Sequence, residues 1–175
     1  MGQWGIGPIR ADTFFERDVI HHLFPKARVK DVMLRVTPDE TLDAIVVKQG
    51  GTEMLEIDDG DATAPGTDDP LIGKVRALNG PVIGPRGESL GMSWTAAGFD
   101  LSACEIGVGR DRNTVICARR GEGAITYYFT VPTWDSEEVP PESLMRKAAY
   151  LKEMVWSPPP PSTPSSVAPA KPPAS

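Results

Sequence analysis

The 175-residue chain carries 24 acidic and 18 basic residues, for a net charge of −6, and the basic residues are spread along the sequence. It lacks the basic stripe with which proteins grip nucleic acid or anionic membranes, so neither is expected as a partner. No apolar run approaches the roughly 18 residues of a membrane-spanning helix. The length and the 40% apolar content predict one globular domain, with room for an appendage.

A short helix is the first element that the sequence predicts. Thr13 and Glu16 have the spacing of a capping box, in which each side chain hydrogen-bonds the backbone N–H of the other residue. The following stretch places apolar residues on one broad helical face, and Pro25 would end the helix. Those apolar residues are Phe15, Val19, Ile20, Leu23 and Phe24.

The middle of the chain predicts strands. Residues 31–36 alternate between polar and apolar, as in a half-buried strand. The residues expected to face the core are Val32, Leu34 and Val36. Residues 44–48 and 52–57 predict a hairpin that turns through residues 49–51, which include two glycines. Further strands are expected at residues 71–78, 102–108, 114–118 and 125–131. The acidic residues 58–70 and the Gly- and Pro-rich residues 79–91 are expected to be loops.

Residues 141–156 predict a closing helix, because Pro141 suits a helix start and apolar residues then recur at helical spacing. These apolar residues are Leu144, Ala148, Leu151 and Val155, followed by Trp156. A helix, then strands, then a helix predicts a single α+β domain of residues 1–156 with a mainly antiparallel sheet.

The composition changes abruptly at residue 157. Eight of the 19 residues from 157 to 175 are proline, and most of the others are Ser, Ala or Thr. Such a segment has little apolar surface to bury, which predicts a disordered tail in extended polyproline conformations. Residues 161–164 also have PxxP spacing, and a ligand for a proline-recognising domain is the functional alternative.

Cys104 and Cys117 indicate the compartment. Their midpoint falls between Arg110 and Asp111, within the turn-forming residues 109–113. A hairpin centred there would place the two cysteines directly opposite one another, at a separation that can contract to that of a disulfide. A disulfide without a third cysteine is typical of an exported protein. The alternative is a pair of buried thiols in a cytosolic core.

Ser89 lies in Gly87-Glu88-Ser89-Leu90-Gly91, which matches the G-x-S-x-G nucleophile elbow of hydrolases. In that fold a strand must precede the serine and the histidine base must follow it. Here Pro81 and Pro85 interrupt the preceding stretch, and both histidines of the chain come before Ser89. A serine hydrolase that uses Ser89 is therefore the alternative function, and no catalytic residue is assigned.

No metal or cofactor site is predicted. His21 and His22 are adjacent on the first helix, so both imidazoles cannot share one helical face. The acidic residues 58–70 lack the order and the closing Glu of an EF-hand. Tyr128 and Trp134 are the candidates for surface recognition, because alternation places Tyr128 opposite its apolar neighbours and aromatic residues are enriched at interfaces.

The start of the chain has the look of a family signature. It reads Gly5-Ile6-Gly7-Pro8-Ile9, followed by a short helix that closes on Leu23-Phe24-Pro25. Together with the two cysteines, the Tyr127-Tyr128-Phe129 strand and a final helix to Trp156, this resembles the RpoE-regulated lipoproteins, a bacterial envelope family with a domain of unknown function. The resemblance implies export, an envelope location and induction under envelope stress. It supplies no catalytic residues.

The sequence as given has no signal peptide or lipid-accepting cysteine near Met1. A lipid anchor would therefore require residues upstream of Met1. Our leading hypothesis is a non-enzymatic module of the bacterial cell envelope, periplasmic or attached to the outer membrane, that binds another envelope component or supports its maintenance. An inhibitor of an envelope enzyme and a cytoplasmic protein are the further alternatives.

Overall fold

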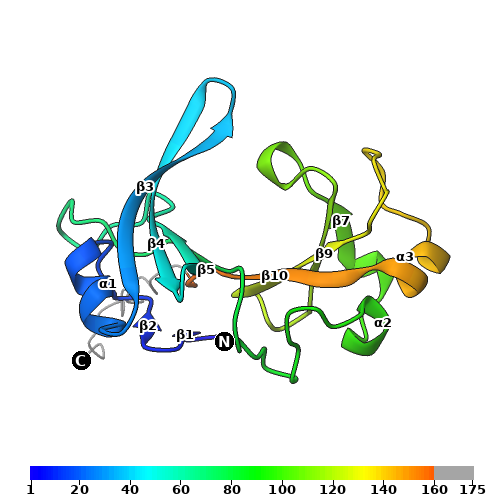
Figure 1. Ribbon diagram of the computed structural model, residues 1–175, viewed down its shortest axis with the longest axis horizontal. Coiled ribbons are helices and arrows are strands. Elements are labelled where there is room, and N and C mark those ends of the chain that lie inside the picture. The colour runs from blue at the N-terminus through cyan, green and yellow to red at the C-terminus, as the bar shows by residue number, and fades with distance from the viewer. Residues whose placement is uncertain (160–175) are drawn as a thin grey trace, which may run out of the picture.

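The computed structural model describes residues 1–159, and an eight-stranded antiparallel sheet organises them (Figure 1). In spatial order its strands are β3 (Arg28–Thr37), β4 (Glu40–Gln49), β5 (Thr52–Asp58), β6 (Lys74–Ala77), β10 (Tyr150–Trp156), β9 (Ile125–Thr130), β8 (Thr114–Ala118) and β7 (Cys104–Ile106). β1 (Gly5–Ile6) and β2 (Ile9–Arg10) form a separate two-stranded sheet, whose Ile6 and Ile9 belong to the same core. The helices are α1 (Arg17–Leu23), α2 (Trp94–Ala97) and α3 (Glu142–Ala148), and the 3-10 turns are η1 (Leu101–Ala103) and η2 (Gly109–Asp111).

The strand order departs from the chain order at one place. β10 lies between β6 and β9, and so joins the meander β3–β6 to the meander β7–β9. In Figure 1, β10 runs across the middle of the molecule, with α1 beside β3 at one end and α2 and α3 at the other. The outer end of the β3–β4 hairpin projects from the body.

One face of the sheet carries the apolar core. Alternation along β9 places Tyr127 and Phe129 in this core and Tyr128 on the opposite face. The core continues through Trp156 of β10 and Trp94 of α2, which are 0% and 1% exposed. The predicted α+β class, with a mainly antiparallel sheet, is confirmed.

The predicted capping box of the first helix is wrong. α1 begins at Arg17, and Glu16 makes no side-chain cap. The Thr13 hydroxyl oxygen instead accepts a hydrogen bond from the backbone N–H of Arg10, at 2.9 Å. The backbone of residues 13–15 forms hydrogen bonds with a later segment: the N–H of Ile72 donates to the Thr13 carbonyl oxygen at 3.0 Å. This tertiary pairing keeps residues 13–15 outside the helix.

The predicted hairpin of β4 and β5 is confirmed. Gln49 pairs with Thr52 across a two-residue turn, in which Gly50 and Gly51 have φ of 57° and 84°. Two successive residues in the left-handed region are what a type I′ turn demands, and glycine enters that region without steric cost.

The other predicted strands differ from the structure mainly at their ends. β8 coincides with residues 114–118, β9 ends one residue earlier than expected, and β6 and β7 are shorter than the predicted ranges. In β3 the alternation is correct, since Val32, Leu34 and Val36 are the less exposed residues. All three are half-buried.

The predicted closing helix is wrong in its second half. α3 ends at Ala148, and the chain then forms β10. Within β10, Met154 and Trp156 belong to the core while Val155 lies between them on the opposite face, and all three are buried. The last three residues of β10 are thus buried on both faces and form a continuous apolar run without alternation, so the helical spacing from Leu151 to Val155 is no guide to its structure.

No helix within residues 1–159 is long and apolar enough to cross a membrane. The predicted disordered tail and its PxxP stretch lie, from residue 160 onward, outside the described residues.

Candidate functional site

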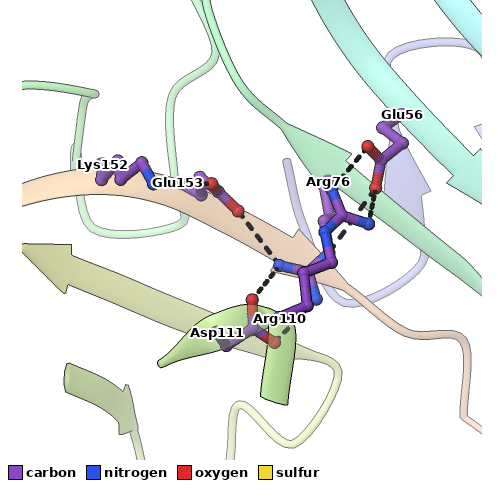
Figure 2. Close-up of polar contacts among 6 residues, drawn as sticks. All are labelled: Glu56, Arg76, Arg110, Asp111, Lys152 and Glu153. Carbon is purple, nitrogen blue, oxygen red and sulfur yellow. Dashed lines mark hydrogen bonds and ion pairs between the residues drawn. The ribbon is translucent and has the colours of Figure 1, made fainter. Parts of the chain in front are cut away.

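A cluster of charged side chains lies on the sheet face opposite the core (Figure 2). Glu56 of β5 and Arg76 of β6 are cross-strand partners, and their exposed fractions are only 4% and 5%. Glu153 joins them from β10. η2, which follows β7, places Arg110 and Asp111 against the same cluster. We call these five residues the charged cluster.

Arg76 is at the centre of the charged cluster. Its Nη1 and Nη2 donate to the two carboxylate oxygens of Asp111 at 2.8 and 2.9 Å, and Nη1 also donates to Glu153 at 3.1 Å. Arg110 Nη2 donates to Glu56 Oε2 at 2.6 Å. Two arginines therefore pair with three carboxylates, and they hold η2 onto β5, β6 and β10.

Burial and ion pairing act in opposite directions on Arg76. Burial alone would lower its pKa, but the hydrogen bonds and negative charge of Asp111, with Glu153 nearby, raise the pKa above its ordinary value. The hydrogen bond to Glu56 likewise raises the pKa of Arg110. Both guanidinium groups are thus firmly charged, which suits them to hold carboxylates and not to exchange protons.

Two atoms of the charged cluster lack a hydrogen bond within residues 1–159: Glu56 Oε1 and Arg76 Nε. They face each other at 3.8 Å. Glu56 Oε1 does have the charge of Arg110 Nη1 at 2.6 Å, although not in hydrogen-bond geometry. Tyr128 packs on the same face, with the Arg76 guanidinium carbon 5.1 Å from its ring centroid.

A second charged group, around Arg119, holds the loop before α2 to the sheet. Arg119 donates to Glu88, which is 2% exposed, and to the carbonyl oxygens of Ala97 and Gly98 at the end of α2. Its guanidinium carbon also lies 3.9 Å from the ring centroid of Phe99. One side chain therefore satisfies a buried carboxylate and the end of a helix together.

A pocket of about 410 Å³ lies where the N-terminal segment meets the sheet, and we call it the apolar pocket. It is lined by Val47 of β4 and Leu55 of β5, by Phe24 and Ala27, which follow α1, and by residues 81–83. The rest of the lining comes from the first residues of the chain and from Gln49, Met54 and Asn79. Segments far apart in sequence thus converge on one pocket that is partly open to solvent.

Two close contacts shape the apolar pocket. The Met1 ammonium donates to the Ile83 carbonyl oxygen at 2.7 Å, and so joins the N-terminal segment to residues 81–83. Gly80 has a φ of +94°, and a Cβ there would lie 2.2 Å from Cε of Met54. A glycine at this position therefore leaves room for the Met54 side chain, which itself lines the pocket.

The disulfide predicted between Cys104 and Cys117 is confirmed. The two cysteines are register partners of β7 and β8, and their sulfur atoms are 2.04 Å apart. The connection between these strands contains η2, and so the disulfide closes the base of the segment that carries Arg110 and Asp111.

The hydrolase motif does not adopt its usual structure. Ser89 lies in a loop, where it forms an isolated bridge with Ile83, and the next helix begins only at Trp94. His21 and His22 are exposed on α1, and within residues 1–159 neither is hydrogen-bonded to Ser89. Nor do the described residues contain a cluster of three or more His, Cys, Asp or Glu side chains that could hold a metal ion.

The two aromatic candidates for recognition have different surroundings. Tyr128 lies on the predicted face, but it is only 7% exposed because Arg76 and η2 cover that face. Trp134 is half-buried, and its indole N–H donates to the Glu138 carbonyl oxygen at 3.0 Å. A recognition role for either residue stays a prediction.

Sequence reasoning missed both the charged cluster and the apolar pocket. Alternation along β5 and β6 marks Glu56 and Arg76 as facing away from the core, which is the one available signal. Their partner Asp111 is 35 residues beyond Arg76. Only the strand order, with β10 inserted, brings them together.

Comparisons with known proteins support the fold. No family model matches the sequence, and no curated protein matches it. The structure is similar to the crystal structure of the uncharacterized protein YfeY from Escherichia coli, with a TM-score of 0.64 and 18% sequence identity. The alignment covers 90% of this chain and 98% of that chain. At this identity, what the two chains are shown to share is the fold.

Proposed function

We propose that this chain is a non-enzymatic module of the bacterial cell envelope that binds another envelope component or supports its maintenance. The Cys104–Cys117 disulfide is the observation that carries the proposal. Disulfides persist in oxidising compartments such as the periplasm and are rare in the reducing cytosol. The resemblance of the N-terminal segment to the RpoE-regulated lipoproteins and the likeness in fold to a bacterial protein support the same assignment.

The way the buried charges are used supports a binding role over catalysis. Arg76 and Arg119 each pair with carboxylates of this chain, and each fixes a loop to the sheet. Groups used in this way create a rigid surface from loops. Rigid, pre-organised loops are what a binding module presents to its partner.

The proposal is tested by the location and thiol state of the protein in a bacterial cell. The gene is expressed with its natural upstream sequence, free thiols are blocked by alkylation before lysis, and the cell fractions are then separated. We expect the protein in the envelope or periplasmic fraction, with no alkylated cysteine. A Cys117→Ala variant, which leaves one free thiol, is the control for alkylation. Protein found in the cytosol with both thiols alkylated would refute the proposal.

A further inference from the structure

The lining of the apolar pocket is uncharged. Among the residues that line it there is no Asp, Glu, Lys, Arg or His side chain, although these types make up about a quarter of the sequence. The Met1 ammonium is beside the pocket, but it is engaged by the Ile83 carbonyl oxygen, and burial lowers its pKa. A charged ligand would lose its hydration here without gaining a side chain of opposite charge. The pocket therefore favours an uncharged ligand.

The size of the pocket limits the ligand further. Its 410 Å³ falls in the range of about 300–1,000 Å³ that is typical of small-molecule sites. At about 30 Å³ for each water-sized group, it holds roughly 14 such groups. A single alkyl chain or a small aromatic body has this size.

Two amide side chains make one end of the apolar pocket polar. Gln49 and Asn79 line the pocket and are exposed, so they lie where it meets solvent. The Asn79 Nδ2 donates to the Glu53 carbonyl oxygen at 2.8 Å, which fixes that amide and leaves its own oxygen as an acceptor. Amides recognise hydroxyl, amide and ester groups by hydrogen bonds that require no charge.

We propose that the apolar pocket binds an uncharged amphiphile: an alkyl chain or small aromatic body that ends in a hydroxyl, amide or ester group. The apolar body lies against Val47, Leu55 and Phe24, and the polar end lies beside Gln49 and Asn79. Met54 can adjust to the shape of the body, because its thioether chain is unbranched and flexible. This proposal does not depend on where in the cell the protein is located.

The test is a fluorescence titration of the full chain with N-phenyl-1-naphthylamine, an uncharged probe that becomes bright in apolar surroundings. We expect saturable binding to one site. Decan-1-ol should displace the probe at a concentration at least about tenfold lower than decanoate needs, a preference that the missing cationic side chain predicts. Non-saturable binding, or equal displacement by the alcohol and the carboxylate, would overturn the proposal.

A pocket-filling variant locates the binding site. Ala27→Trp places a large side chain in the lining and should weaken probe binding at least about tenfold. Ala62→Trp is the matched control, because Ala62 is also half-buried but lies outside the pocket, and it should bind like the wild type. If Ala27→Trp does not fold by circular dichroism, Val82→Trp fills the same pocket from another segment. Wild-type binding by a folded filled variant would refute the site.

Discussion

The Arg76 guanidinium donates to both carboxylate oxygens of Asp111, although the two residues belong to β6 and to the turn η2 beyond β7. This two-bond pair spans the sheet face that the core does not use. It fixes the connection between edge strand β7 and its neighbour β8 to the centre of the sheet, and this connection covers the face opposite the core. The cover explains why Tyr128 is buried on a face predicted to be open.

Asp111→Ala should therefore destabilise the fold. It removes both hydrogen bonds and leaves buried Arg76 with Glu153 as its remaining hydrogen-bonded carboxylate. We expect the free energy of unfolding in urea to fall by about 2–4 kcal/mol, since a buried charge that loses its partner is costly. Glu105→Ala, an exposed acidic residue on β7, is the control and should change it by less than about 0.5 kcal/mol. Equal effects of the two substitutions would show that η2 is not fixed by this pair.

Asp58 makes stability depend on pH. Burial, the largest cause, raises the pKa of this carboxyl, while Lys74 and Arg76 partly oppose the rise. The folded state therefore holds the Asp58 proton more tightly than the unfolded state. Protonated Asp58 therefore stabilises the folded state. This stabilisation is fully present below the pKa that Asp58 has in the unfolded state, and it is lost as the pH rises through the pKa that Asp58 has in the folded state.

Asp58→Asn should accordingly be more stable than the wild type at pH 7, and the advantage should shrink as the pH is lowered towards 4. Urea unfolding at several pH values measures the difference. Asp39→Asn, at an exposed turn position, should show no such trend. A stability advantage of Asp58→Asn that grows on acidification would show that folding lowers the pKa of Asp58 and does not raise it.

Trp156 and Trp4 should differ strongly in how much the same substitution costs the fold. Trp156 is 0% exposed at the end of β10, whereas Trp4 is 69% exposed. Trp156→Ala should lower the free energy of unfolding by about 3–5 kcal/mol through the cavity it leaves. Trp4→Ala should change it by about 0.5 kcal/mol or less. Thermal melts of both variants provide the comparison, and a mild effect at Trp156 would place β10 outside the core.

Arg119 should not tolerate lysine. A single ammonium cannot pair with Glu88, bond the end of α2 and lie over Phe99 at the same time, as the guanidinium does. We expect Arg119→Lys to lower the free energy of unfolding by about 1–3 kcal/mol. Arg120→Lys, next in the chain and exposed, should be neutral. If both variants melt together with the wild type, the Arg119 contacts contribute nothing to stability.

The elements that the sequence predicts correctly are those specified by residues close together in the chain. Residues 114–118 lie close to the turn that pairs Cys117 with Cys104, so the strand and the disulfide are both encoded within residues 104–118. The glycines at positions 50 and 51 likewise specify their turn without help from the rest of the fold. Local spacing and turn chemistry were sufficient for these elements.

Sequence reasoning failed where distant segments decide the structure. The capping box at Thr13 was lost because residues 13–15 pair with a later segment, and the closing helix became a strand because β6 and β9 flank it. The charged cluster needs β5, β6 and β10 in one register, which no short window of sequence contains. The apolar pocket likewise has no motif, since its lining comes from separate segments.

The position of β10 governs the order in which this sheet can be completed. During synthesis the meander β3–β6 is finished first and β7–β9 next, yet within the described fold the two have no common strand until residues 150–156 emerge. Until then β6 and β9 each present an open edge, and open edges are templates for pairing with other chains. Insertion of the last strand closes both edges at once. A copy that stops before Tyr150 keeps both edges open and is therefore a form prone to aggregate.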